Sequence, residues 1–208
     1  MRRTKQDAAV TREVVLDAAL GVFSRAGYAA ATLDDVANDA GVTRGAVYWH
    51  FAGKADLYSA LVAERFGRAA VAIMAAAESA PTPVAKLRAL LVASLTHLET
   101  DRDYRAIVEL TLFKAEALPE IADSLDAKRA ALRSQRELAA SLIAGAKARG
   151  DVRSGVDPNA AAITLLGLVN GIAVLWLLDP GAFSLTHQAE QSVDLALSAI
   201  TRSGDRDG

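Results

Sequence analysis

The sequence predicts an all-α protein, with a small three-helix domain at the N-terminus and a larger helical domain after it. Apolar residues recur at helical spacing along most of the chain, which is rich in alanine and has only five prolines in 208 residues. Hydrophobic residues make up 52% of the sequence, so the chain can bury a sizeable core in one or two domains. We place the domains at residues 1–53 and 54–208.

The charge and cysteine content exclude several classes of function. The chain has no cysteine, which removes disulfides and thiolate sites and suits a reducing cytoplasm. The formal net charge is −2, so any binding to nucleic acid must come from a local basic patch. Arg2, Arg3, Lys5 and Arg12 form such a patch before the first apolar period. A basic arm lying along phosphates and a merely soluble terminus both fit it, and no apolar segment of a secretion signal accompanies it.

The first long helix is expected to begin at Thr11, a favourable N-cap residue, and to end at Gly27. Tyr28 follows and is expected to pack onto the core of the small domain. The buried stripe of this helix is predicted to contain Val14, Val15, Ala18, Ala19, Val22 and Phe23.

Residues 32–54 have the pattern of two short helices joined by a tight turn. Thr32 can cap the first helix, with Asp35 adding negative charge to its first turn. Gly41 ends that helix because glycine accepts a left-handed backbone without a Cβ clash. Thr43 then supplies a hydroxyl at the start of the second helix.

The second of these helices is predicted to place Tyr48 and Trp49 on its outer face, because Val47 and Phe51 lie one turn apart and can pack inward. Exposed aromatic side chains suggest a partner surface. A helix-turn-helix that inserts its second helix into the DNA major groove would use them. A helical hairpin whose aromatics pack on another helix of the same chain fits the spacing equally well.

Four motifs within residues 11–60 distinguish these alternatives: F-x-x-x-G-Y, T-L-x-D-V-A, A-G-V-T-R-G-x-V-Y-W-H-F and G-K-x-D-L. Together they resemble the DNA-binding domain of the TetR family of bacterial repressors. The resemblance implies a dimeric, ligand-released transcription repressor. We expect a cytoplasmic homodimer that binds double-stranded operator DNA, with no enzymatic activity and no cofactor. The residues expected to contact DNA are Thr32, Thr43, Arg44, Gly45, Tyr48, Trp49, His50 and Lys54. Of these, Thr43 to Gly45 would contact base edges, and Tyr48 to Lys54 would bind phosphates.

A helix from residue 54 to 79 is expected next, and its length of about 40 Å would bridge the two domains as a lever. Pro81 and Pro83 mark the break that follows. Further helices are expected at 84–100, 103–116, 119–149, 158–178 and 186–202, with a short separate piece at the start of 119–149. The polar tail from Ser203 is expected to be disordered.

The segment 158–178 contains no charged residue and is long enough to span a membrane. Asp157 and Asp179 flank it without a nearby basic anchor, so we expect a helix buried in a core or an interface instead. With the last helix, it is predicted to form a four-helix dimer interface. The interface residues are expected to be Gly167, Gly171, Leu175, Val193 and Leu197, with the two glycines in G-x-x-x-G spacing for close helix approach.

The run L-F-K-A-E at residues 112–116 and the run N-G-I-A-V-L-W-L-L-D-P, followed by F-S-L, resemble the AcrR-type repressors of multidrug efflux pumps. This resemblance implies an apolar pocket for a small hydrophobic or aromatic inducer. The pocket residues are expected to be Leu91, Leu95, Glu109, Phe113, Ala139, Ile143, Leu166, Asn170 and Val174, and packing in the core is the alternative role of each. Glu109 and Asn170 are favoured as ligand contacts, because polar groups on apolar helices need partners.

Other functions find less support in the sequence. There is no phosphate-binding glycine loop and no nucleophile motif. His97 and Asp101 have a spacing that suits two metal ligands, but no third ligand is near, so an ion pair or a solvated histidine is expected. A regulator of a metabolic or catabolic operon, an activator, and a small-molecule-binding protein without DNA function remain as alternatives.

Overall fold

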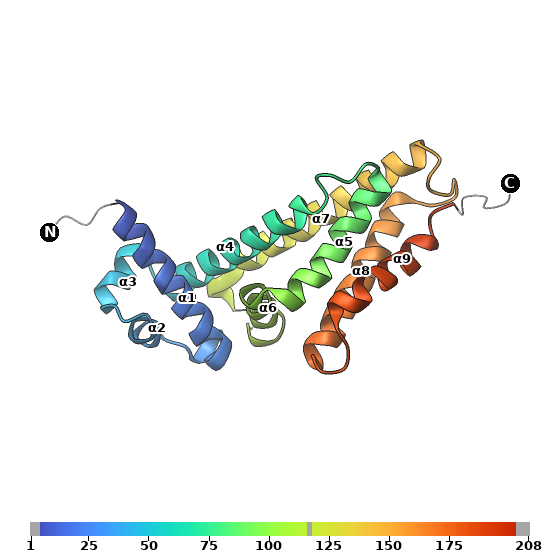
Figure 1. Ribbon diagram of the computed structural model, residues 1–208. Coiled ribbons are helices and arrows are strands. Elements are labelled where there is room, and N and C mark those ends of the chain that lie inside the picture. The colour runs from blue at the N-terminus through green and yellow to red at the C-terminus, as the bar shows by residue number, and fades with distance from the viewer. Residues whose placement is uncertain (1–4, 116–117, 203–208) are drawn as a thin grey trace. The chain divides into compact units, whose positions relative to one another are not determined.

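The computed structural model describes residues 5–115 and 118–202, and within them the all-α prediction is confirmed (Figure 1). The helices are α1 (Lys5–Ala30), α2 (Leu33–Asp39), α3 (Arg44–His50), α4 (Lys54–Ala75), α5 (Pro83–Thr100), α6 (Arg102–Glu109), the π-helix η1 (Leu110–Lys114), the 3₁₀ helix η2 (Pro119–Ile121), α7 (Ala122–Ala148), α8 (Pro158–Leu178) and α9 (Leu185–Ser198). The expectations for Arg2, Arg3 and the tail from Ser203 lie outside the described residues, as does Glu116 of the L-F-K-A-E run.

The helices form two compact units that interleave along the chain. The first unit contains Met1–Arg68 and Asp103–Lys128, and the second contains Ala69–Arg102 and Arg129–Gly208. The first unit therefore extends past residue 53, because Leu57 and Leu61 at the start of α4 are buried in its core. The continuous helices α4 and α7 each contribute residues to both units. A functional boundary at 53/54 stays a prediction.

Helix α1 begins earlier than predicted. Its first residue is Lys5, and Thr11 is an interior residue whose hydroxyl donates to the carbonyl oxygen of Asp7 at 2.9 Å. The segment before Thr11 contains helix-favouring alanines, and Asp7 places negative charge in the first turn. At the other end, Gly27 has φ of +76°, so the regular helix is broken there as predicted.

The core of the first unit is centred on three aromatic rings from α1 and α4. Phe23, Tyr28 and Tyr58 lie with ring centroids 4.9–5.9 Å apart and are at most 3% exposed. Tyr28 thus packs in the core, as expected from the sequence. Burial is the main cause that raises the pKa of Tyr58 to about 12, so this phenol is neutral at physiological pH.

A buried arginine connects three helices of the first unit. The side chain of Arg65, on α4, is 1% exposed and forms ion pairs with Glu13 and Asp17 of α1 and with Asp103 of α6. Glu13 also accepts a hydrogen bond from Arg68 at 2.6 Å. Partial burial acts to raise the pKa of Glu13, but the hydrogen bonds from the two arginines outweigh it and hold that pKa below its ordinary value.

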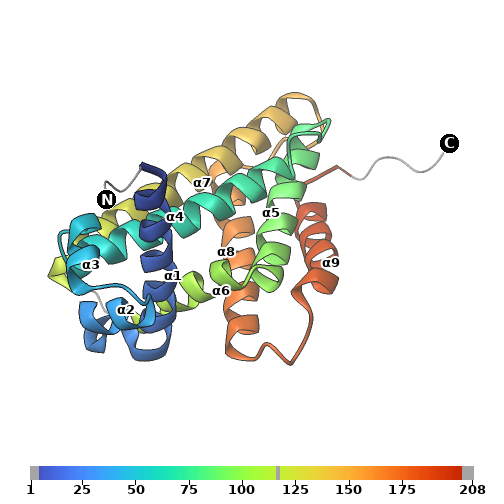
Figure 2. The same cartoon turned by 60° about the vertical axis from the view of Figure 1, so that its left-hand side comes forward.

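In the second unit, α5, α8 and α9 run side by side (Figure 2). Arg88 of α5 donates to both carboxylate oxygens of Asp194 on α9, at 2.6 and 2.9 Å. Glu99 accepts hydrogen bonds from the Ser184 hydroxyl at 3.0 Å and the Thr186 N–H at 2.6 Å, so a side chain of α5 binds the start of α9. These contacts fix which face of α9 lies inside the subunit.

Candidate nucleic-acid interface

Local hydrogen bonds build the turn between α2 and α3. The Thr32 N–H donates to Asp35 Oδ2 at 3.0 Å, and the Asp35 N–H donates to Thr32 Oγ1 at 3.1 Å. Hydrogen bonding from Thr32 lowers the pKa of Asp35. Gly41 has φ of +64°, and Thr43 Oγ1 accepts from the Ala46 N–H at 3.2 Å. The predicted cap, stop and second cap are all confirmed.

Helix α3 has one buried and one exposed face, as its spacing predicted. Val47 and Phe51 are at most 2% exposed, whereas Tyr48 is 46% and Trp49 is 69% exposed. The buried pair holds the helix on the core, and the aromatic pair projects into solvent. Within the described part of the first unit, this pair therefore does not serve as the core of a helical hairpin.

Arg44, the first residue of α3, forms hydrogen bonds with one residue of α2 and with one residue of its own helix. Its Nη1 donates to Asp34 Oδ2 on α2 at 3.0 Å, and its Nη2 donates to the Tyr48 hydroxyl oxygen at 3.2 Å. The guanidinium carbon lies 5.4 Å from the Tyr48 ring centroid. Hydrogen bonding to Tyr48, followed by the charge of Asp34, raises the pKa of Arg44.

Lys54, which is predicted to contact a phosphate, forms hydrogen bonds within the subunit. Its Nζ donates to the carbonyl oxygens of Tyr28, Ala29 and Ala31 at 3.0, 3.1 and 3.2 Å, and lies 4.5 Å from the Tyr28 ring centroid. An ammonium group has three donors, and all three are occupied here. Lys54 therefore binds the C-terminal end of α1, where carbonyl groups lack helical partners.

Of the other residues predicted to contact DNA, some are open to solvent, whereas others are engaged within the fold. Thr43 and Gly45 are exposed beside Arg44 at the start of α3. Thr32 is exposed, but its hydroxyl takes part in the cap of α2. His50 is half-buried with Nε2 withdrawn from solvent, and its ring lies edge-on to Trp49 at 4.5 Å, so this nitrogen is not presented to a phosphate.

Arg12 is part of the folded unit and not of a free basic arm. Its guanidinium forms an ion pair with Glu64 of α4 and lies 5.2 Å from the centroid of the Phe51 ring. This contact is not expected from the sequence, because a helix that begins at Thr11 leaves Arg12 at its edge. A helix start at Asp7 would have placed Arg12 one turn inside α1.

The comparisons with known proteins agree with this geometry. Residues 15–61 match the bacterial regulatory proteins of the tetR family, and residues 82–201 match the C-terminal region of MAATS-type transcriptional repressors. The HTH-type transcriptional regulator TtgR of Pseudomonas putida is 32% identical over 206 residues, which cover 96% of each chain. The chain belongs to the TetR family. It is thus a DNA-binding transcriptional regulator of the helix-turn-helix type.

Solved structures of TetR-family repressors have the same fold. NalD, the secondary repressor of the MexAB-OprM multidrug efflux pump in Pseudomonas aeruginosa, is 28% identical with a TM-score of 0.83, covering 96% of this chain and 100% of that one. SmeT, the repressor of the Stenotrophomonas maltophilia pump SmeDEF, is 30% identical in its complex with triclosan. Its TM-score is 0.81, and the match covers 94% of this chain and 93% of SmeT.

In the second unit of this TetR-family chain, α8 and α9 have an exposed apolar face. Its large exposed side chains are Ile163, Leu168, Leu175, Leu178 and Leu195, between 42% and 76% exposed. Gly167 and Gly171 are also exposed, and a Cβ added to either would meet nothing within 4 Å. Among the predicted interface residues, the two glycines and Leu175 therefore point away from the subunit.

Two of the predicted interface residues lie inside the subunit instead. Val193 and Leu197 are 1% and 5% exposed, because they continue the buried stripe that α9 packs within its own unit.

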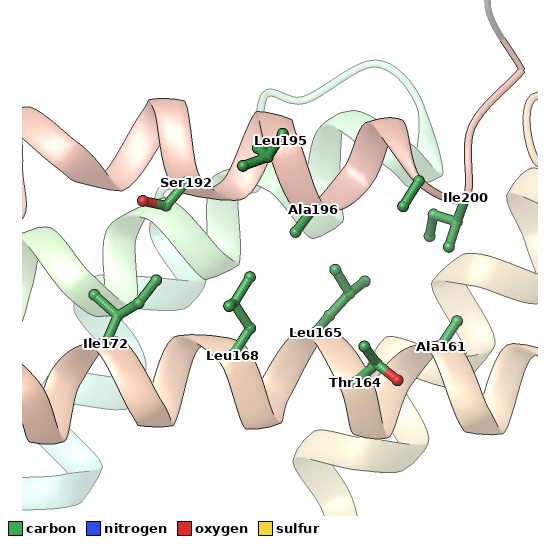
Figure 3. A pocket seen from close by; sticks show the side chains of 10 residues that line it. Ala161, Thr164, Leu165, Leu168, Ile172, Ser192, Leu195, Ala196 and Ile200 are labelled. Carbon is green, nitrogen blue, oxygen red and sulfur yellow. The ribbon is translucent and has the colours of Figure 1, made fainter.

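Leu195 and Ile200 lie in the groove between α8 and α9, opposite Leu165 and Leu168 (Figure 3). The groove has a volume of about 430 Å³ and is lined almost entirely by carbon atoms.

The residues expected at an inducer pocket are not all in the same environment. Leu91 and Leu95 on α5 and Ala139 and Ile143 on α7 are buried, and Leu166 and Val174 on α8 are half-buried. Asn170 is exposed, so water can satisfy its amide and it does not need a ligand. The expected reason for a ligand contact, an Asn170 amide that lacks a partner on an apolar helix, is not met in the subunit, and the contact itself stays a prediction.

Glu109 and Phe113 belong to the other compact unit. Glu109 ends α6 and is half-buried, whereas Phe113 lies in η1 and is 47% exposed. Lys114, the last residue of η1, donates to the carbonyl oxygen of Ser24 on α1 at 2.6 Å. A π-turn within a helix is uncommon and often marks a functional segment.

Helix α8 is long and apolar enough to span a membrane by composition, with a mean hydropathy of 2.2 over its most apolar window. It begins at the Asp157 N-cap, whose carboxylate accepts from the Ala160 N–H at 2.8 Å, and it packs on α5 and α9.

In the described part of the chain, no group of three or more His, Asp or Glu could hold a metal ion. His97 Nε2 lies 3.6 Å from Asp101 Oδ2, one helical turn away.

Proposed function

We propose that this chain is a homodimeric repressor that binds a roughly palindromic operator through α3 of each protomer. The observation that carries the proposal is the exposed surface of α3, where Thr43, Arg44, Gly45, Tyr48 and Trp49 lie together. Arginine can bind guanine edges, the glycine permits close approach of the backbone, and the aromatic side chains offer a hydroxyl and an indole N–H to phosphates.

The homodimer is supported by the exposed apolar face of α8 and α9. A monomer that exposes Leu175, Leu178 and Leu195 to water would carry an unfavourable apolar patch. A twofold axis through this face buries the same residues from both protomers and forms a four-helix interface. The two copies of α3 would then bind successive major grooves, about 34–36 Å apart.

The inducer is proposed to be a small apolar or aromatic molecule that binds the C-terminal helices. The support is the buried apolar side chains of α5 and α7 and the similarity to SmeT, which has been solved with triclosan. Helices α4 and α7 are continuous between the two compact units, so a ligand that alters their setting in one unit can alter the other. The inducer acts only to the extent that its affinity differs between the operator-bound and free forms.

The regulated gene is proposed to encode a multidrug efflux pump, because NalD and SmeT repress such pumps. A cytoplasmic location follows from this role, and the chain has no cysteine to require an oxidising compartment. No cofactor and no catalytic residue enters the proposal.

Binding to the DNA upstream of its own coding region tests the proposal. We expect a gel shift on that duplex, but not on a random duplex of equal length, and loss of the shift when triclosan is added. A variant with Trp49→Ala and Tyr48→Ala should lose the shift, while Val71→Ala on α4 should retain it. The absence of a preference for the upstream DNA in the unaltered protein would contradict the proposal. A shift that is insensitive to triclosan and to other apolar drugs would contradict only the inducer.

A further inference from the structure

The contact between Asp34 and Arg44 joins the two helices of the helix-turn-helix at their exposed surface. Arg44 Nη1 donates to Asp34 Oδ2 at 3.0 Å, and the side chains are 59% and 55% exposed, respectively. Arg44 Nη2 donates to Tyr48 OH at 3.2 Å. One acid and one phenol thus hold the guanidinium from two sides.

This arrangement leaves Arg44 able to bind a base. A guanidinium has five N–H donors, and Asp34 and Tyr48 each accept from one of them. The remaining donors are enough for a bidentate contact with O6 and N7 of guanine. A guanidinium whose orientation is fixed before binding loses less conformational freedom when it forms such a contact.

Asp34 is not needed for the stability of the fold. Asp35, not Asp34, forms the reciprocal cap with Thr32 at the start of α2. An exposed ion pair such as Asp34–Arg44 contributes little to folding. A carboxylate on a surface that faces DNA also repels phosphates of every sequence, so it weakens binding in general.

We propose that Asp34 is a specificity-determining residue of the DNA-binding surface. It positions Arg44 for one guanine in each half-site of the operator, and its negative charge weakens binding to DNA of every sequence. Because the repulsion lowers operator affinity and random-DNA affinity alike, it is the positioning of Arg44 that increases the ratio of operator affinity to random-DNA affinity. The inference rests on the proposed function, because it requires that α3 bind a specific operator.

Binding measurements on Asp34→Ala and a matched control test this inference. Asp39→Ala is the control, because Asp39 is on the same helix and is paired with Arg25 at 2.6 Å instead of Arg44. The duplexes are the operator footprinted upstream of the coding region, a set in which each of its G·C pairs is changed singly, and a random duplex. Thermal unfolding of each variant confirms that it is folded.

For Asp34→Ala we expect random DNA to bind about threefold more tightly, because one repulsive charge is removed. Discrimination at one G·C pair in each half-site should fall on the order of tenfold, while discrimination at the other pairs is kept. Asp39→Ala should keep the discrimination at every pair. Arg44→Ala should lose discrimination at the same pair in each half-site, and adding Asp34→Ala to it should cause no further loss there, because the two residues act as one unit.

Two results would overturn the inference while leaving the proposed function intact. One is an operator-selective protein in which Asp34→Ala keeps the discrimination at every pair. The other is an equal loss at all pairs, which would show a general disturbance of the surface. If the unaltered protein bound upstream and random DNA equally well, the proposed function and this inference would both be overturned.

Discussion

The guanidinium of Arg65, on α4, donates a hydrogen bond to Glu13 of α1 at 2.8 Å from a site where its side chain is 1% exposed. Two further carboxylates, Asp17 and Asp103, share this guanidinium. A buried charge of this kind depends on its partners, because removing one side leaves the other side uncompensated. The network therefore makes the attachment of α4 and α6 to α1 sensitive to single substitutions.

Replacing Arg65 by alanine should reduce the free energy of unfolding by about 2–4 kcal/mol, since three acidic groups then lose their common partner. The three acids are partly exposed, which keeps the expected loss below that of a fully buried pair. Urea unfolding measures the change. Arg68→Ala is the matched control, because Arg68 is 57% exposed and contacts the same Glu13, and it should cost less than about 1 kcal/mol. Equal losses for the two variants would contradict the importance of burial.

The acid stability of the protein should depend on Glu13. Its pKa is depressed in the folded state, so the unfolded state binds the proton more readily. The stabilisation by Glu13 is therefore fully present above the ordinary glutamate pKa and is lost as the pH falls through the lower pKa of the folded state. Glu13→Gln should make the loss of stability less steep below about pH 4.5. Glu78→Gln, at an exposed position, should leave the acid limb of the stability curve unchanged. The same acid limb for Glu13→Gln and the unaltered protein would refute this prediction.

Local sequence signals were enough to predict α2 and α3. Thr32, Gly41 and Thr43 act through hydrogen bonds and backbone angles within a few residues, so their positions specify the turn directly. The partners of the long charged side chains could not be predicted in this way. Lys54 and Arg65 are partnered by residues more than 20 positions away, and no local pattern indicates such a partner.

The lack of a local signal for distant partners also explains why two interface residues of the second unit were predicted wrongly. Helix α9 has apolar residues on more than one face, and the sequence alone could not tell that Val193 and Leu197 lie inside the subunit while Leu195 lies outside. The packing of α9 on α5 decides this, and α5 and α9, which the Arg88–Asp194 contact joins, lie far apart in the sequence. In the first unit, the division between α6 and η1 at Glu109 also lacked a sequence signal, because no proline or glycine marks it.

Lys54→Gln separates a structural role of Lys54 from a role at phosphates. Loss of the charged hydrogen bonds to the end of α1 should reduce the free energy of unfolding by about 1.5–3 kcal/mol. The slope of log affinity against log salt should stay unchanged when operator binding is measured well below the melting temperature, because no phosphate contact is removed. Calorimetry and a salt titration provide the two measurements. A slope reduced by about one unit per protomer, with stability unchanged, would instead indicate a phosphate contact.

Leu175→Glu should convert the proposed dimer into a folded monomer. Leu175 is 64% exposed on α8, so the fold of the subunit should tolerate the charge. In a dimer the new carboxylate would be buried without a partner near the twofold axis, and we expect the dissociation constant to rise on the order of 30-fold or more. Sedimentation velocity over a concentration series measures the shift. Val71→Glu introduces the same charge at a 72% exposed position on α4 and should leave the dimer intact. If Leu175→Glu remained dimeric, or if Val71→Glu dissociated equally, the interface would lie elsewhere than on α8 and α9.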